Sequence, residues 1–244
     1  MDLSKLPVGV NPPYDVNAII EIPQGGEPVK YEIDIFPESR NAEMRGDQII
    51  ENRTQTAIAE IHIVRDRIFK TDIELEGVKN FTDDREHGYR IYSLDKPMQP
   101  GESRRMKFKV ASQTRGFEND LTVKELMPNG TFFNNTIAPQ IGYQPRGELS
   151  THNARKKYGL PYKEMMPYLE RNCTEHCRNT YMSNNSEWVD VETVISTVPS
   201  QIAIAPGSLV REWTEGGRRD FHYKLDHSSM NFYALMSARP ALAR

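Results

Sequence analysis

The clearest candidate chemistry in this sequence lies in one short segment. Cys173, His176 and Cys177 offer two thiols and an imidazole, which are ligand types that suit zinc. A closed zinc site needs four ligands, and no second ligand pair at metal-binding spacing follows. The alternative is a polar segment with two incidental thiols, which would pair with each other only under oxidation. Two cysteines are too few for a disulfide framework, so nothing demands an oxidising compartment.

Carboxylates offer a second kind of chemistry, because hard divalent ions bind to clustered acidic side chains. Asp83, Asp84 and Glu86 come nearest to such a cluster, but the neighbouring Arg85 and Gly88 favour an exposed turn over a magnesium site. Three motifs of known enzyme classes do not occur in the sequence: His-Glu-x-x-His, Gly-x-Ser-x-Gly and the phosphate-binding P-loop.

Charge and hydropathy exclude further classes of protein. The 244 residues carry 31 basic and 34 acidic side chains, a net charge of −3, whereas a dedicated nucleic-acid binder shows a basic stripe. No run approaches the roughly 18 apolar residues that cross a bilayer, so we expect no membrane segment. The N-terminus lacks the apolar core of a signal peptide. We therefore expect a cytoplasmic protein.

Alternation of apolar and polar residues is the main structural signal, and it predicts strands with one buried face. It is clear over residues 29–35, 105–110 and 220–225, and further strands are expected around residues 58–63, 89–92, 188–197, 201–205, 209–214 and 231–236. Turn signals such as Gly46-Asp47, Pro100-Gly101 and Gly216-Gly217 separate these runs. The pattern predicts an all-β protein, an antiparallel β-sandwich.

Two segments depart from this pattern. Residues 151–158 read as one short helical segment, and a second turn near residues 162–169 is limited by Pro161 and Pro167. Residues 1–28 are rich in proline and glycine around one apolar run. We therefore predict an irregular N-terminal arm over residues 1–28, laid on a sandwich domain of residues 29–244.

From about Tyr31 onward the chain resembles the N-terminal β-sandwich domain of zinc aminopeptidases of the aminopeptidase N type. The bacterial branch fused to ABC-transporter permeases is the most similar. The matching stretches are Ile33–Arg40, Gly88–Tyr92, Gln99–Ser103, Asn129–Asn135, Pro139–Gln144, Arg155–Pro161, Gln201–Gly207 and Glu212–Lys224.

This resemblance implies a saddle-like sandwich that packs beside a catalytic domain and walls its peptide-binding cleft. The family's zinc ligands and catalytic tyrosine lie downstream of the sandwich, so no catalytic residue and no cofactor is expected in these residues. In the family, a polar side chain of the sandwich reaches the free amine of the substrate. Gln140 and Gln144 are the candidates for this role. The resemblance also implies a membrane-associated parent protein.

A second resemblance covers residues 6–34, which are similar to the opening of soluble family I inorganic pyrophosphatases. It rests on the stretches Leu6–Gly9 and Ile20–Asp34. In that family the matching residues line a magnesium pyrophosphate site, and here they are Glu21, Lys30 and Glu32. The family's Asp-Gly-Asp-Pro-x-Asp cluster does not follow. Each magnesium ion prefers about six oxygen ligands, more than these residues supply.

We therefore expect a non-catalytic β-sandwich module of an aminopeptidase-like protein, acting in peptide recognition or domain packing. Its expected partner is a catalytic peptidase domain, or a second copy of the chain where that domain is missing, because a separated sandwich exposes the surface that its neighbour covered. The alternative is a degenerate, magnesium-dependent pyrophosphatase. A zinc-dependent fold at Cys173, His176 and Cys177 is a third hypothesis.

Overall fold

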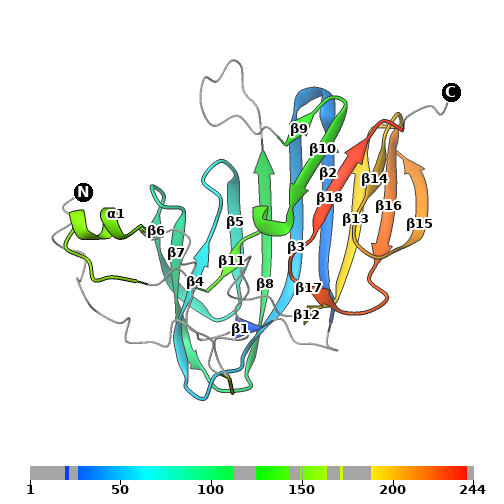
Figure 1. Ribbon diagram of the computed structural model, residues 1–244. Coiled ribbons are helices and arrows are strands. Elements are labelled where there is room, and N and C mark those ends of the chain that lie inside the picture. The colour runs from blue at the N-terminus through cyan, green and yellow to red at the C-terminus, as the bar shows by residue number, and fades with distance from the viewer. Residues whose placement is uncertain are drawn as a thin grey trace.

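Strands make up most of the regular structure in the described part of the computed structural model (Figure 1). It describes residues 20–21, 27–112, 125–142, 149, 151–163, 171–172 and 188–240, and for residues 20–21 only the backbone. The all-β class and the sandwich that the alternation predicts are both confirmed. No helix of these described residues is long and apolar enough to cross a membrane.

One large sheet forms the frame of the molecule. Its order is β15 (Ser208–Glu215), β16 (Arg218–Lys224), β13 (Val191–Thr197), β2 (Val29–Phe36), β3 (Asn41–Asn52), β8 (Ser103–Ser112) and β5 (Lys70–Leu75), with β1 (Ile20–Glu21) paired to β3. All of these pairs are antiparallel except β2 with β13. That parallel pair joins residues 29–34 to residues 191–196, so an early strand and a late strand lie side by side at the centre.

Two four-stranded sheets pack against one face of this frame. The first runs β14 (Ile202–Ile204), β18 (Ala234–Ala238), β10 (Gly130–Asn134) and β9 (Leu126–Met127); the second runs β11 (Gln140–Ile141), β4 (Ile58–Val64), β7 (Tyr89–Met98) and β6 (Val78–Asp84). A short pair, β12 (Trp188–Val189) with β17 (Ser229–Met230), completes the strands. Figure 1 shows β10 and β18 in front of the large sheet and β6 and β7 at the end opposite β15.

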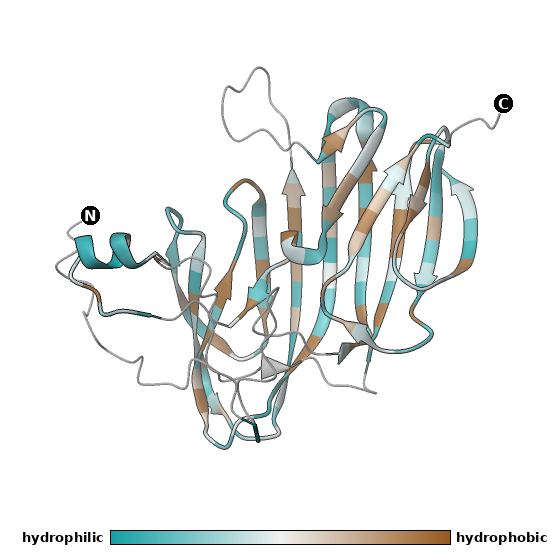
Figure 2. Ribbon diagram, viewed as in Figure 1, coloured by the Kyte–Doolittle hydropathy of each residue, from teal (hydrophilic) through white to brown (hydrophobic). Residues whose placement is uncertain are grey.

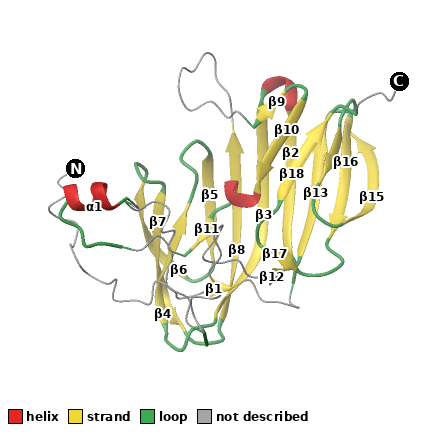
Figure 3. Cartoon of the chain, viewed as in Figure 1, coloured by secondary structure: helices red, strands yellow, loops and turns green. Residues whose placement is uncertain are grey.

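Within the described residues, helical structure occurs only in short segments (Figure 3). The helix α1 (His152–Lys157) lies within the range that the sequence predicts, and the Thr151 side chain caps it by accepting a hydrogen bond from Ala154 N at 3.3 Å. Two single 3-10 turns, η2 (Pro37–Ser39) and η3 (Asn135–Ile137), follow β2 and β10. Most of the predicted second turn, and most of the N-terminal arm, lie outside the described residues.

The core lies between the large sheet and the two smaller ones. Strand β2 shows how the alternation fills it: Tyr31, Ile33 and Ile35 are buried, whereas the intervening side chains lie on the outer face. Burial raises the pKa of Tyr31 to about 12, an effect that the neighbouring Tyr233 hydroxyl only partly offsets. This phenol therefore stays neutral in the core at physiological pH.

The predicted turn at Gly46-Asp47 is wrong, because both residues lie inside β3, which runs unbroken for 12 residues. Gly46 pairs with Tyr31 on one side and with Phe108 on the other. The Phe108 ring lies over Gly46, at 6.1 Å from the Tyr31 ring centroid, and occupies the space that a side chain would fill. The glycine therefore makes room for a core aromatic ring instead of reversing the chain.

We expect Gly46→Ala to destabilise the fold by about 1–3 kcal/mol, the usual cost of overpacking a core. The new methyl group would overlap the buried Phe108 ring, which has no free space to move into. Urea unfolding measures the loss. Gly130→Ala in β10 is the matched control, because its nearest neighbour would lie at 3.5 Å, an ordinary contact. Equal stability of Gly46→Ala and the native chain would contradict this account of the strand.

Candidate functional site

Two of the three residues that match the pyrophosphatase site lie on the outer face of the large sheet. Lys30 and Glu32 project side by side from β2 and are exposed. Glu32 accepts a hydrogen bond from Arg45 Nε at 3.0 Å, and Lys30 lies opposite Asp47 in β3. The backbone of Glu21 pairs with Glu51, further along β3 than Asp47, the partner of Lys30. The Glu21 side chain is not among those that the structure describes. The structure thus brings Lys30 and Glu32 together but not the backbone of Glu21.

Arg45 is the centre of a charged network on this face. Its guanidinium bonds to Glu32, to Asp34 at 2.9 Å and to Glu43. A hydrogen bond from Lys109 lowers the pKa of Glu43, and Arg45 lowers it further. The carboxylates of this face are thus matched by cations across the strands, as in a solvated sheet surface. No group of three or more metal-ligating side chains occurs among the residues that the structure describes.

Gln140, one of the two candidates for contact with a substrate amine, lies in β11 at the edge of a small sheet. Its side-chain Nε2 donates to Ala138 O at 3.0 Å and to Asn135 O at 3.4 Å. Asn135 in turn bonds to Asn231, so this amide helps to hold η3 in place. The substrate role of Gln140 stays a prediction. Gln144 lies outside the described residues.

The proposed zinc ligands Cys173, His176 and Cys177 also lie outside the described residues. The zinc hypothesis therefore stays a prediction as well.

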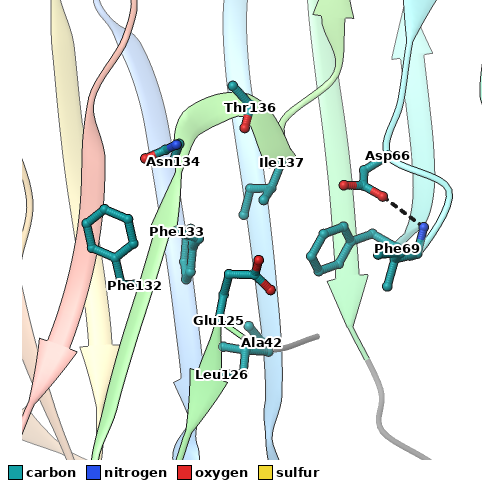
Figure 4. Close-up of a pocket in the computed structure, with 11 residues that line it drawn as sticks. Ala42, Asp66, Phe69, Glu125, Leu126, Phe132, Phe133, Asn134, Thr136 and Ile137 are labelled. Atoms are coloured by element: carbon teal, nitrogen blue, oxygen red, sulfur yellow. Dashed lines mark hydrogen bonds between the residues drawn. The ribbon is translucent and has the colours of Figure 1, made fainter. Parts of the chain in front are cut away.

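A pocket of about 230 Å³ opens beside the first small sheet. Figure 4 shows Phe133, Ile137 and Glu125 directed into it, with Asp66 and Phe69 facing them from the segment after β4. Asp66 accepts a hydrogen bond from Ile68 N at 2.9 Å. Apolar walls with two carboxylates at the rim suit an apolar group that carries a positive charge.

An apolar row crosses the outer face of the same sheet. Ile204 of β14 lies opposite Met236 of β18, and Met236 lies opposite Phe132 of β10, so the three side chains share one face. Phe132 is 54% exposed and Ile204 47%. We call Ile204, Met236 and Phe132 the apolar row. Figure 2 shows hydrophobic residues on these strands, and β15 of the large sheet also exposes Leu209 and Val210.

The acidic segment for which the sequence predicts an exposed turn begins at the end of a strand and continues into that turn. Asp83 and Asp84 end strand β6, and only the following residues turn. Asp83 Oδ1 accepts hydrogen bonds from Arg65 at 2.8 Å and Arg90 at 3.0 Å. Burial raises the pKa of Asp83, but these two hydrogen bonds outweigh it and lower the pKa to about 2. The turn expected from Arg85 and Gly88 is therefore present at residues 85–88, whereas Asp83 belongs to the strand and is paired with two arginines.

Two sequence signals could have revealed these sites. Phe132 and Phe133 are adjacent in a strand, so one of them must face outward. Arg90 stands two positions before the buried Tyr92 and so shares its face, which places a charge in a core-facing register. Neither signal says which other strands supply the neighbours.

No model of a known protein family matches the chain. A stretch of 34 residues is 91% identical to the inorganic pyrophosphatase of Caulobacter vibrioides and 68% identical to that of Rhodospirillum rubrum. Each match covers 14% of this chain and 19% of the pyrophosphatase. The chain therefore shares a short segment, about a fifth of their length, with these enzymes.

The fold is similar to that of an M1 zinc metallopeptidase from Deinococcus radiodurans. One crystal structure matches with a TM-score of 0.50 at 11% identity, over 87% of this chain and 42% of the metallopeptidase. A point mutant of that protein matches with a TM-score of 0.50 at 11% identity, over 92% of this chain and 46% of the mutant. The chain thus spans less than half the length of these proteins, and at such identity the likeness concerns the fold alone. Both resemblances noted from the sequence are confirmed to this extent.

We expect Asp83→Asn to destabilise the chain at pH 7 by roughly 2 kcal/mol, because it leaves two guanidinium groups without their carboxylate. The native pKa of Asp83, about 2, lies below the unfolded value of about 3.9, so this stabilisation is present above pH 4 and is lost as pH falls toward 2. The stability difference between the variant and the native chain should therefore shrink from pH 5 to pH 2.5 in urea unfolding. A difference independent of pH would show that the carboxylate charge is irrelevant.

Proposed function

We propose that this chain is a non-catalytic β-sandwich module that packs beside a catalytic peptidase domain and contributes one wall of its peptide cleft. The observation that carries the proposal is the metallopeptidase fold, which extends over nearly all of this chain but less than half of the metallopeptidase. Association with an ABC-transporter permease, which the sequence resemblance implies, is part of the same proposal.

The two outer faces of the sandwich support this division of roles. The outer face of β2 and β3 carries paired charges, which are stable in water. The apolar row exposes about half of two large side chains on adjacent strands, and such exposed patches mark interaction surfaces. We therefore place the neighbouring domain on the outer face of the β14-β18-β10-β9 sheet.

The pocket beside the apolar row fits the same proposal. Its lining includes Phe132, but Figure 4 shows Phe132 and Phe133 on opposite sides of β10, so the pocket adjoins the apolar row only at Phe132. Asp66 and Glu125 would attract a lysine, an arginine or a free amine from the partner or from a peptide. Gln140 and Gln144 remain the proposed contacts to the substrate amine.

We expect the purified chain to self-associate in the absence of its neighbour, and Phe132→Ser to weaken that association by about tenfold. Half-burial of a phenylalanine contributes on the order of 1–2 kcal/mol, which corresponds to this factor. Sedimentation velocity over a concentration series measures it. Phe81→Ser is the matched control, since Phe81 is 53% exposed but lies on a different sheet. A native chain that stays monomeric at high concentration would count against the apolar row as a docking surface.

We expect the chain to show no turnover as a pyrophosphatase or as an aminopeptidase. The 34-residue match favours the alternative of a magnesium-dependent pyrophosphatase, but the cations and carboxylates near Lys30 and Glu32 are paired with one another. Phosphate release from pyrophosphate with magnesium, and chromophore release from aminoacyl substrates with zinc, should both stay at background. Activity in either assay that a chelator abolishes, and that is absent from a mock purification, would overturn the non-catalytic proposal.

A further inference from the structure

A cluster of arginines lies where β4, β6 and β7 meet, at the end of the molecule opposite β15 (Figure 1). Arg65 follows β4 directly, Arg90 lies in β7 and Asp83 in β6. Arg90 and Asp83 are cross-strand partners in the register of β6 with β7. The three side chains form the ion cluster, and Arg85 adds a third guanidinium at 3.3 Å from Asp83 Oδ2.

The ion cluster lies on the core-facing side of its sheet. Side chains two positions apart on a strand share a face. Arg90 thus shares the face of the buried Tyr92, and Asp83 that of Phe81, whose ring lies 5.4 Å from the Tyr92 ring. These aromatic rings line one side of the cluster, and the Arg90 guanidinium lies 5.4 Å from the Phe81 ring centroid. Because Phe81 is half exposed, this ring marks the side of the cluster that lies nearest to solvent.

The charges of the ion cluster do not balance. The side chains of Arg65 and Arg90 are only 10% and 14% exposed, and both guanidiniums share a single oxygen of Asp83. Asp84, the next carboxylate along the chain, bonds to His87 instead. Within the part of the chain that the structure describes, the cluster therefore holds an excess of positive charge with little access to water, which is costly.

The cluster also has unused hydrogen-bonding capacity. Arg65 Nε is buried and has no hydrogen-bond partner among the described residues. Leaving a buried charged donor unsatisfied costs more than an average hydrogen bond contributes. An anion with several oxygens would satisfy this donor and the excess charge together, since guanidiniums bind carboxylate and phosphate in a two-pronged geometry.

We propose that Arg65 and Arg90 form a binding site for a small oxyanion, a phosphate or a carboxylate. The site lies at the end of the β11-β4-β7-β6 sheet where β4 and β6 end and β7 begins. Asp83 occupies one hydrogen-bonding position of each guanidinium and so competes with the anion, and the half-exposed Phe81 ring lies beside the entrance. The site lies on a different sheet from the apolar row and does not depend on the proposed function.

Binding of inorganic phosphate and of acetate to the full chain tests the site, with sodium chloride at matched ionic strength as the reference. Isothermal titration calorimetry measures affinity, and thermal unfolding measures stabilisation by the bound anion. We expect at least one of the two oxyanions to bind and to raise the unfolding temperature above that in chloride. Phosphate alone would assign the site to phosphoryl groups, and binding of both would assign it to carboxylates as well. No difference between either anion and chloride would overturn the proposal.

Two substitutions with opposite effects separate the site from general electrostatics. Arg65→Gln should weaken anion binding about tenfold, the value of one charge-assisted hydrogen bond. Asp83→Asn removes the competing carboxylate, so phosphate or acetate should stabilise this variant more than the native chain. Lys107→Gln, an exposed cation on β8, is the charge-matched control and should leave the affinity unchanged. Equal effects of Arg65→Gln and Lys107→Gln would show nonspecific attraction and overturn the site, and near-UV circular dichroism verifies that each variant is folded.

Discussion

The structure depends on strand β2, which must satisfy two environments at once. Tyr31, Ile33 and Ile35 fill the core on one side, and Glu32 and Asp34 bond to Arg45 on the other. The same strand pairs antiparallel with β3 and parallel with β13, so it joins the first strands of the sandwich to the last. The resemblance to pyrophosphatases ends within this strand. Residues of a pyrophosphatase-like segment therefore serve here as the central strand of the large sheet.

Polar and apolar surfaces are divided between the two sides of the sandwich. Cross-strand ion pairs link β2, β3 and β8 on the outer face of the large sheet, where exposed charges interact weakly but remain well solvated. The apolar row lies on the opposite side of the molecule's core, over a small sheet whose inner residues, such as Leu235, are fully buried. A sheet with apolar residues on both faces is typical of one that another layer covers. This contrast gives the proposed packing against a peptidase domain its physical basis.

In the ion cluster, nearly buried charged side chains lie at the edge of the hydrophobic core. Tyr92 is buried between the sheets. Arg90 stands two residues earlier on the same face, where the apolar layer ends, and bonds to Asp83. Arginine suits such a boundary because its stem packs against rings while its guanidinium bonds to a carboxylate. Two nearly buried guanidiniums share one carboxylate oxygen of Asp83 at this boundary. The boundary therefore carries a positive charge that the proposed oxyanion would neutralise.

The amino-acid sequence by itself determined the all-β class, many strand positions and the short helix α1, because these depend on residues that are close along the chain. Only the tertiary structure decided the parallel pairing of β2 with β13 and the role of Gly46. Gly46 contacts the Phe108 ring of the adjacent strand β8, which is far away along the sequence. It likewise decided that Asp83 meets Arg65 and that Phe132 aligns with Met236. These contacts depend on strand order and register. The hydrophobic pattern of a strand determines which of its faces is buried, but not which strand lies beside it.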